Sequence, residues 1–168
     1  LLIVNEKRGW RVPLQRLALE AELLQGGDRW TLFGTGLEIQ QGSVAFAVPR
    51  LQLDAWGQAL RLRATAVPLE ALADLAADLS PVQGKLPEVL RALDPGGELS
   101  SLQLSIGDIQ SPASDWEVEA RFRDLQVTSW RGAPGVRSAT GYLEVFPGHG
   151  SVLVDSPNLI LEFPTIYS

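Results

Sequence analysis

The sequence predicts a mainly β protein with a small α part (α+β), built as an antiparallel meander that forms a curved open sheet or half-barrel groove. Alternation of apolar and polar residues over most of the 168 positions is the first observation behind this prediction, and turn-forming residues (16 Gly and 11 Pro) between the runs are the second. A change to helical spacing near residues 68–93 predicts a two-helix insertion. We expect a single domain over 1–168, with strands in 1–67, two short helices in 68–95 and strands in 99–168.

The first strands follow from strict alternation. Residues 17–23 place leucines on one face and Glu20 and Glu22 on the other, and glycines at 26–27 provide a turn before the pattern restarts at Trp30. Two glycines within 34–36 interrupt the next run, as a bulge or a bend would. Apolar residues 1–4 have the composition of a further strand.

Alternation then continues through two more runs. Residues 44–48 form the first, Pro49 breaks the ladder, and 51–53 lead to a turn near 54–57. The second run, 60–66, sets leucines and alanines against arginines. These runs complete an antiparallel meander ahead of the helical insertion.

The period changes at Pro68, which suits the first position of a helix because its missing N–H needs no partner there. Leucines recur at helical spacing over 69–79, and Ser80-Pro81 ends this helix. A second apolar stripe with i, i+3, i+4, i+7 spacing predicts a helix over 86–93, and the turn-forming residues 94–97 follow it.

Strands return after the insertion. Alternating runs predict them at 102–106, at 116–127 with a shift of register near Leu125, at 141–145, at 152–154 and at 159–163. Glycine and proline mark a long turn at 131–135 and a hairpin at 147–150. Three tryptophans each directly follow a turn at the start of a strand, either as similar strand starts or as a repeat: Trp10, Trp30 and Trp116.

Composition excludes several classes of function. The formal charge is −6, so there is no basic field for a nucleic acid, and the lack of cysteine excludes disulfides and thiolate metal sites. No run approaches the roughly 20 apolar residues of a membrane span, and no signal peptide is visible. Because methionine is also absent, we expect the chain to be a fragment of a longer one.

Catalytic patterns are missing as well. The one histidine, His149, lies in a predicted hairpin tip without a positioned partner, and Asp74 and Asp78 fit a solvated helix face. The paired glycines at 34 and 36 and at 148 and 150 have no third glycine and no phosphate-binding lysine. We therefore expect no enzyme activity, no metal and no cofactor.

The remaining signal is the apolar side of the alternating strands. In one reading these faces meet in a dry core, as in a sandwich. In the other, a long curved sheet keeps an apolar face that is only partly covered and holds a ligand. Sequence periodicity is the same in both.

Several segments resemble a known family. The stretch from Leu86 to Leu104 is similar to the helix, Pro-Gly turn and strand of the AsmA-like superfamily, in its YhdP-type branch, and so is the stretch from Phe122 to Gly135. Residues 139–143, 148–156 and 159–164 match the family's small-Gly-x-Leu and Gly-Gly-x-Leu-x-Leu-Asp pattern. His149 departs from it by replacing a small residue of the turn.

The resemblance implies a segment of a periplasmic protein whose parent chain is anchored in the inner membrane of Gram-negative bacteria. It implies an apolar β groove that carries phospholipid between the inner and outer membranes and supports the outer-membrane barrier, with phospholipid acyl chains and other envelope proteins as partners. The alternative is a non-catalytic structural or interaction domain of an envelope assembly. The expected groove lining is Leu17, Leu19, Leu32, Phe46, Val48, Leu62, Leu104, Phe122, Leu143 and Val154.

Overall fold

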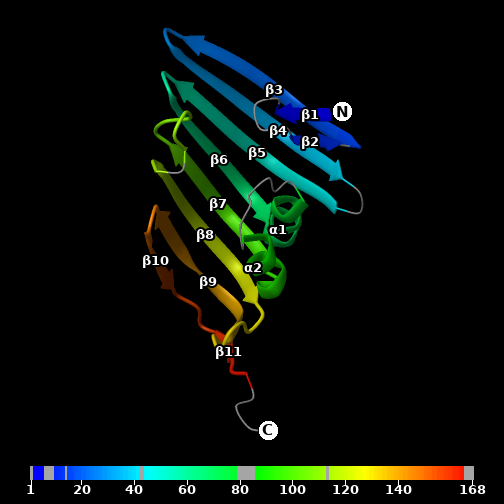
Figure 1. The fold of residues 1–168 in the computed structure, drawn as a ribbon, viewed down its shortest axis with the longest axis vertical. Coiled ribbons are helices and arrows are strands. Elements are labelled where there is room, and N and C mark those ends of the chain that lie inside the picture. The colour runs from blue at the N-terminus through cyan, green and yellow to red at the C-terminus, as the bar shows by residue number, and fades with distance from the viewer. Residues whose placement is uncertain are drawn as a thin grey trace.

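One nine-stranded antiparallel sheet dominates the protein. The computed structural model describes residues 2–5, 10–13, 15–41, 44–78, 86–112 and 114–164, and side chains within 15–40, 45–74, 88–112 and 114–164. Eight strands lie in the order β10-β9-β8-β7-β6-β5-β4-β3, and β11 pairs with part of β9. Figure 1 shows these strands side by side, with β3 at one edge and β10 at the other. The sheet is open and not closed into a barrel.

The strand order follows the chain order, which makes the sheet a meander. Its strands are β3 (Arg16–Gly26), β4 (Arg29–Gln41), β5 (Val44–Trp56), β6 (Ala59–Pro68), β7 (Gly96–Ile106), β8 (Trp116–Val127), β9 (Gly135–Phe146), β10 (His149–Val154) and β11 (Ile160–Glu162). A separate two-stranded sheet pairs β1 (Leu2–Asn5) with β2 (Trp10–Pro13). The mainly β fold with a two-helix insertion is therefore confirmed.

The helices α1 (Leu69–Asp78) and α2 (Leu86–Leu93) follow β6 and precede β7 in the chain, and they lie at one end of these strands (Figure 1). The predicted bounds of the second helix, 86–93, are confirmed, whereas the predicted stop at Ser80-Pro81 lies outside the described residues. Pro68 does not begin the first helix. It is the last residue of β6, where it still aligns with Glu98 of β7, because its fixed φ is compatible with the end of a strand.

Two strand predictions need correction. β5 does not stop at Pro49, and the register shows why: this residue lies between two pairs, Thr35↔Arg50 and Leu37↔Val48, and so opposite Gly36. Gly36 has φ of 61°, so the ladder is already distorted where proline cannot donate. The predicted turn at 54–57 is also shorter, since β5 continues to Trp56.

A line of kinks crosses the sheet. β4, β6, β8 and β9 each contain one residue in the left-handed region, β5 has the unpaired Pro49, and β7 has a register shift beside Ser100. At each kink the apolar positions are three residues apart instead of two, which keeps them on one face of the sheet. These pairs are Gly34 and Leu37, Val48 and Leu51, Ala64 and Val67, Leu99 and Leu102, Phe122 and Leu125, and Val136 and Ala139. Bulges of this kind bend and twist a sheet.

The core lies along this line, on the face that α1 covers. Leu69, Ala71 and Leu72 of α1 pack against the buried cluster of the sheet. Its members are Phe46, Val48, Ala64, Val67, Leu99, Ala120, Phe122 and Ala139. A single sheet layer is thus completed by helices at one end only, and the rest of the apolar face has no such cover among the described residues.

Candidate functional site: an open apolar face

The uncovered part of the apolar face is organised in rows that run across the strands. Residues paired in register point to the same side of a sheet. One row, which we call the leucine row, crosses seven strands from β3 to β9 without a polar residue: Leu23, Leu32, Leu53, Leu62, Leu104, Val118 and Val145. With strands about 4.8 Å apart, this row is roughly 29 Å long.

The leucine row is open to solvent. Leu23 is 58% exposed at the edge of the sheet, and the other six side chains are half-buried rather than enclosed. None of the seven belongs to the buried cluster that packs against α1.

A second row lies closer to the hairpin turns. Trp30 aligns with Ala55, Ala55 with Leu60, Leu60 with Ile106, and Ile106 with Trp116. We call these five residues the tryptophan row. Its two aromatic residues lie near the β3–β4 turn and the β7–β8 loop. They therefore mark the end of the apolar face that lies farthest from α1.

All ten residues that the sequence predicts for the lining lie on this apolar face. Leu17 and Leu19 lie on β3, where Leu19 packs so closely on Gly34 that an added Cβ would be 2.8 Å from its Cδ1. Three of the ten are buried in the cluster beside α1: Phe46, Val48 and Phe122. The other seven are half-buried or exposed: Leu17, Leu19, Leu32, Leu62, Leu104, Leu143 and Val154.

The opposite face is polar, and its centre is Asp54. This side chain has 0% exposure and accepts hydrogen bonds from Arg29 at 2.9 Å, Thr31 at 2.7 Å, Gln52 at 2.9 Å and Arg63 at 3.4 Å. Burial favours the neutral acid. The bonds from Thr31, Arg29 and Gln52 and the charge of Arg29 outweigh that effect, so the pKa of Asp54 is held below its usual 3.8.

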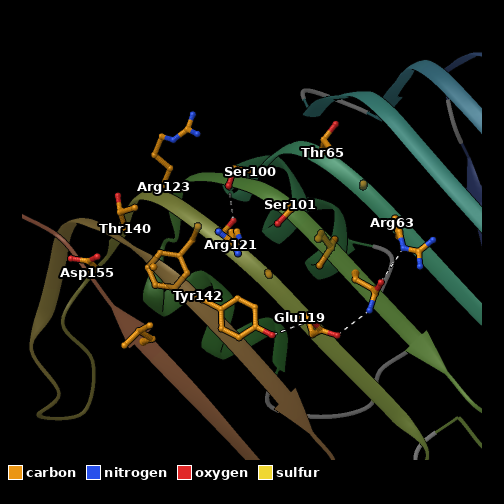
Figure 2. Close-up of a pocket in the computed structure, with 17 residues that line it drawn as sticks. Arg63, Thr65, Ser100, Ser101, Glu119, Arg121, Arg123, Thr140, Tyr142 and Asp155 are labelled. Atoms are coloured by element: carbon orange, nitrogen blue, oxygen red, sulfur yellow. Dashed lines mark hydrogen bonds between the residues drawn. The ribbon is translucent and has the colours of Figure 1, made fainter.

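Hydrogen bonds continue from Asp54 across the sheet. Arg63 donates to Gln103 at 3.0 Å, Gln103 donates to Glu119 at 2.9 Å, and the Tyr142 hydroxyl donates to Glu119 at 3.1 Å (Figure 2). This polar ladder joins β4 to β9. Loss of hydration, followed by the bond to Glu119 and the charges of neighbouring carboxylates, raises the pKa of Tyr142 above its usual 10.0.

A hollow of about 950 Å³ lies over the polar face of β6 to β10. Short hydroxyl side chains from Thr65, Ser101 and Thr140 line it, with Arg121 and Tyr142 beside them (Figure 2). Of the ten predicted lining residues, Phe122 also borders this hollow. By register, Thr65, Ser101, Arg121 and Tyr142 form a row on the face of the sheet opposite the leucine row.

The residues considered for catalysis do not converge. His149 is exposed at the start of β10 and stacks on Phe146, with ring centroids 4.8 Å apart, and Asp74 is exposed on α1. Within the described part of the chain, no three His, Asp or Glu side chains gather closely enough to hold a metal ion. Of the helices in the described residues, none has the length and apolarity that crossing a membrane would require.

The AsmA-like resemblance implies an apolar β groove, and the structure has an open antiparallel sheet with one partly covered apolar face. The family model described as YhdP protein matches residues 5–168, and the chain belongs to this family. Comparison with curated proteins and with solved structures found no significant match. Family membership indicates a role in envelope or lipid transport.

Sequence reasoning missed the polar ladder. Asp54 looks like one of several scattered aspartates, and the predicted turn at 54–57 hides its place inside β5. A signal was present in the alternation itself, because Gln52, Asp54, Arg61 and Arg63 all lie opposite the leucines of two adjacent runs. Only the pairing of β5 with β6 shows that they face one another.

Proposed function

We propose that the open apolar face binds the acyl chains of phospholipid, within a protein that carries phospholipid between the inner and outer membranes and supports the outer-membrane barrier. The leucine row carries this proposal: seven adjacent strands present only Leu or Val there, and none is enclosed. An exposed apolar surface of this extent in a protein marks a binding site.

The energetics favour an apolar occupant. Full burial of a Leu or Val side chain is worth about 1.5–3 kcal/mol. Six side chains of the leucine row are already partly covered by their neighbours, so an acyl chain laid on them gains only a fraction of this value at each position. Summed over seven positions, that gain still reaches several kcal/mol, and no charged group in the row would have to be desolvated.

The proposal includes no catalytic step, metal or cofactor for this chain. In support, the buried carboxylate of Asp54 is saturated by four donors, and His149 stacks on Phe146 at an exposed position. It also places the chain in the periplasm, with its parent protein anchored in the inner membrane. These two assignments rest on the family.

A matched pair of neighbouring leucines tests the proposal. Leu23 and Leu24 are 58% and 49% exposed on the same strand, but they point to opposite faces. The sequence has no cysteine, so Leu23→Cys and Leu24→Cys each allow labelling at one site with a polarity-sensitive fluorophore. After incubation with vesicles of phosphatidylethanolamine and phosphatidylglycerol and removal of the vesicles, we expect a blue shift at position 23 and none at 24.

The outcome is read together with lipid analysis of the isolated protein. A shift at position 23 with co-purified phospholipid supports the proposal. Equal shifts at both positions, or no phospholipid in the isolated protein, would overturn it. Both substitutions are at well exposed sites, so the folded state is expected to tolerate them.

One observation favours the alternative of a structural or interaction domain. β10 is an edge strand whose consecutive residues Val152, Leu153 and Val154 are 65%, 65% and 44% exposed, with apolar side chains on both faces. An edge of this kind is a template for pairing with another strand. If Leu153→Lys abolished association with other envelope proteins while Leu23→Cys showed no lipid-dependent shift, this second function would replace the first.

A further inference from the structure

The apolar face has two different ends. At one end α1 covers the buried cluster, so apolar side chains continue under a helix. At the other, Trp30 and Trp116 close the tryptophan row beside the β3–β4 turn and the β7–β8 loop, which contain charged residues such as Asp28, Asp108 and Asp115. A bound amphipathic molecule therefore meets polar surroundings at the hairpin end of the face.

Tryptophan is the side chain best suited to such a boundary. Its indole combines a large apolar surface with a polar N–H, and it concentrates where hydrocarbon meets water and headgroups. Trp30 is 43% exposed, and Trp116 is half-buried. The three residues between them in the row, Ala55, Leu60 and Ile106, are aliphatic, so the two indoles frame an apolar strip.

The distance between the two ends matches one acyl chain. On β6, Leu60 belongs to the tryptophan row and Ala64 belongs to the buried cluster, four residues further along. At about 3.4 Å per residue this is roughly 14 Å. One leaflet contributes about half of the roughly 30 Å hydrocarbon core of a bilayer, so an extended acyl chain has nearly the same length.

We propose that a bound phospholipid lies with its headgroup at the hairpin end, beside Trp30 and Trp116, and its acyl chains along the strands toward Ala64 and Ala120. This orientation rests on the proposed function and assigns the two tryptophans as positioning residues.

Trp56 provides an internal control. It lies near the same rim, but on the polar face, where its ring is 5.6 Å from the guanidinium of Arg29 and 5.3 Å from that of Arg61. A lipid on the apolar face cannot contact this ring. Three single-tryptophan variants, retaining Trp30, Trp116 or Trp56 with the other four tryptophans changed to Phe, therefore report on the two faces separately.

The test uses quenching by bromine within the lipid. Each variant is loaded from vesicles of phosphatidylcholine brominated near the ester end or near the methyl end of the chains, and then separated from the vesicles. We expect the ester-end bromines to quench Trp30 and Trp116 at least twofold more than the methyl-end bromines. Trp56 should be unaffected. A fourth variant has all five tryptophans changed to Phe and carries Leu143→Trp, next to the buried cluster. Methyl-end bromines should quench this tryptophan more than ester-end bromines.

The outcomes separate the two proposals. Lipid that remains bound but quenches Trp30 and Trp116 equally from both ends, or more from the methyl end, overturns the orientation only. An absence of bound lipid overturns the proposed function itself. If the multiple substitutions prevent folding, Trp30→Phe and Trp116→Phe in the otherwise native chain give the same test, because each should remove part of the ester-end quenching.

Discussion

Asp54 allows the sharpest test of how this sheet is held together. Asp54→Asn preserves the size of the side chain but removes its charge and replaces one acceptor oxygen with an amide donor. The oxygen that remains can still accept from Arg29 and Thr31. The new amide faces the Gln52 and Arg63 donors, at 2.9 and 3.4 Å in the native protein, and has no acceptor there.

The magnitude follows from these contacts. A hydrogen bond to a charged group contributes about 1.5–3 kcal/mol. Since the Arg63 side chain is 42% exposed, water replaces much of what it loses, and we take about 1 kcal/mol for each of the two lost bonds, from Arg63 and Gln52. Burying an amide without an acceptor adds about 1 kcal/mol. The substitution should therefore lower the free energy of unfolding by about 2–3 kcal/mol.

Urea unfolding at pH 7, with midpoint and slope measured together, gives this free energy directly. Asp74→Asn, at an exposed position on α1, is the control and should change it by less than about 0.5 kcal/mol. A cost below about 0.5 kcal/mol for Asp54→Asn would show that the bonds from Gln52 and Arg63 contribute nothing net. That result would refute the reasoning.

The same experiment has a pH dependence with a definite sign. The pKa of Asp54 is lowered in the folded state, so its charge stabilises the protein fully above the usual value of 3.8. This contribution is lost as the pH falls through the lower pKa of the folded state. The difference between native protein and Asp54→Asn should therefore shrink at acidic pH, and a difference that grows there would contradict the assignment.

Two further predictions concern the kinks and the end of the polar ladder. Ala66→Gly should raise the free energy of unfolding by about 0.5 kcal/mol, because Ala66 has φ of 53°, which glycine adopts without strain. The control, Ala47→Gly at an exposed position of β5, should lower it by about 0.5–1 kcal/mol. Equal changes in the free energy of unfolding by urea for the two variants would contradict this. The raised pKa of Tyr142 means that its bond to Glu119 stabilises the protein below pH 10.0 and is lost as the pH rises through the raised value, so the native protein should lose stability more steeply in alkali than Tyr142→Phe. The difference between the alkaline absorbance titrations of the native protein and Tyr142→Phe reports the ionisation of Tyr142. We expect this ionisation above pH 10.0, and ionisation below that value would refute the raised pKa.

Local patterns predicted much of the fold because alternation and turn residues act over short stretches. The helix at 86–93 and the shift of register near Leu125 were predicted from spacing alone, and the structure contains both. Alternation with a period of two also indicates which residues of one strand share a side, without knowledge of strand order. Pro49 was misread because its tolerance depends on Gly36 of the neighbouring strand, which no local pattern contains.

The sequence by itself determined that this protein has strands with one apolar side and a short helical insertion between them. Tertiary structure decided which apolar positions are enclosed and which stay open. Ala64 and Leu62 have the same place in the alternation of β6, yet Ala64 lies in the buried cluster and Leu62 lies in the leucine row. Tertiary pairing also buried Asp54 among donors from β4, β5 and β6. Burial depends on residues that are distant in the chain, so it is fixed only when strands pair and the helices dock at one end of the sheet.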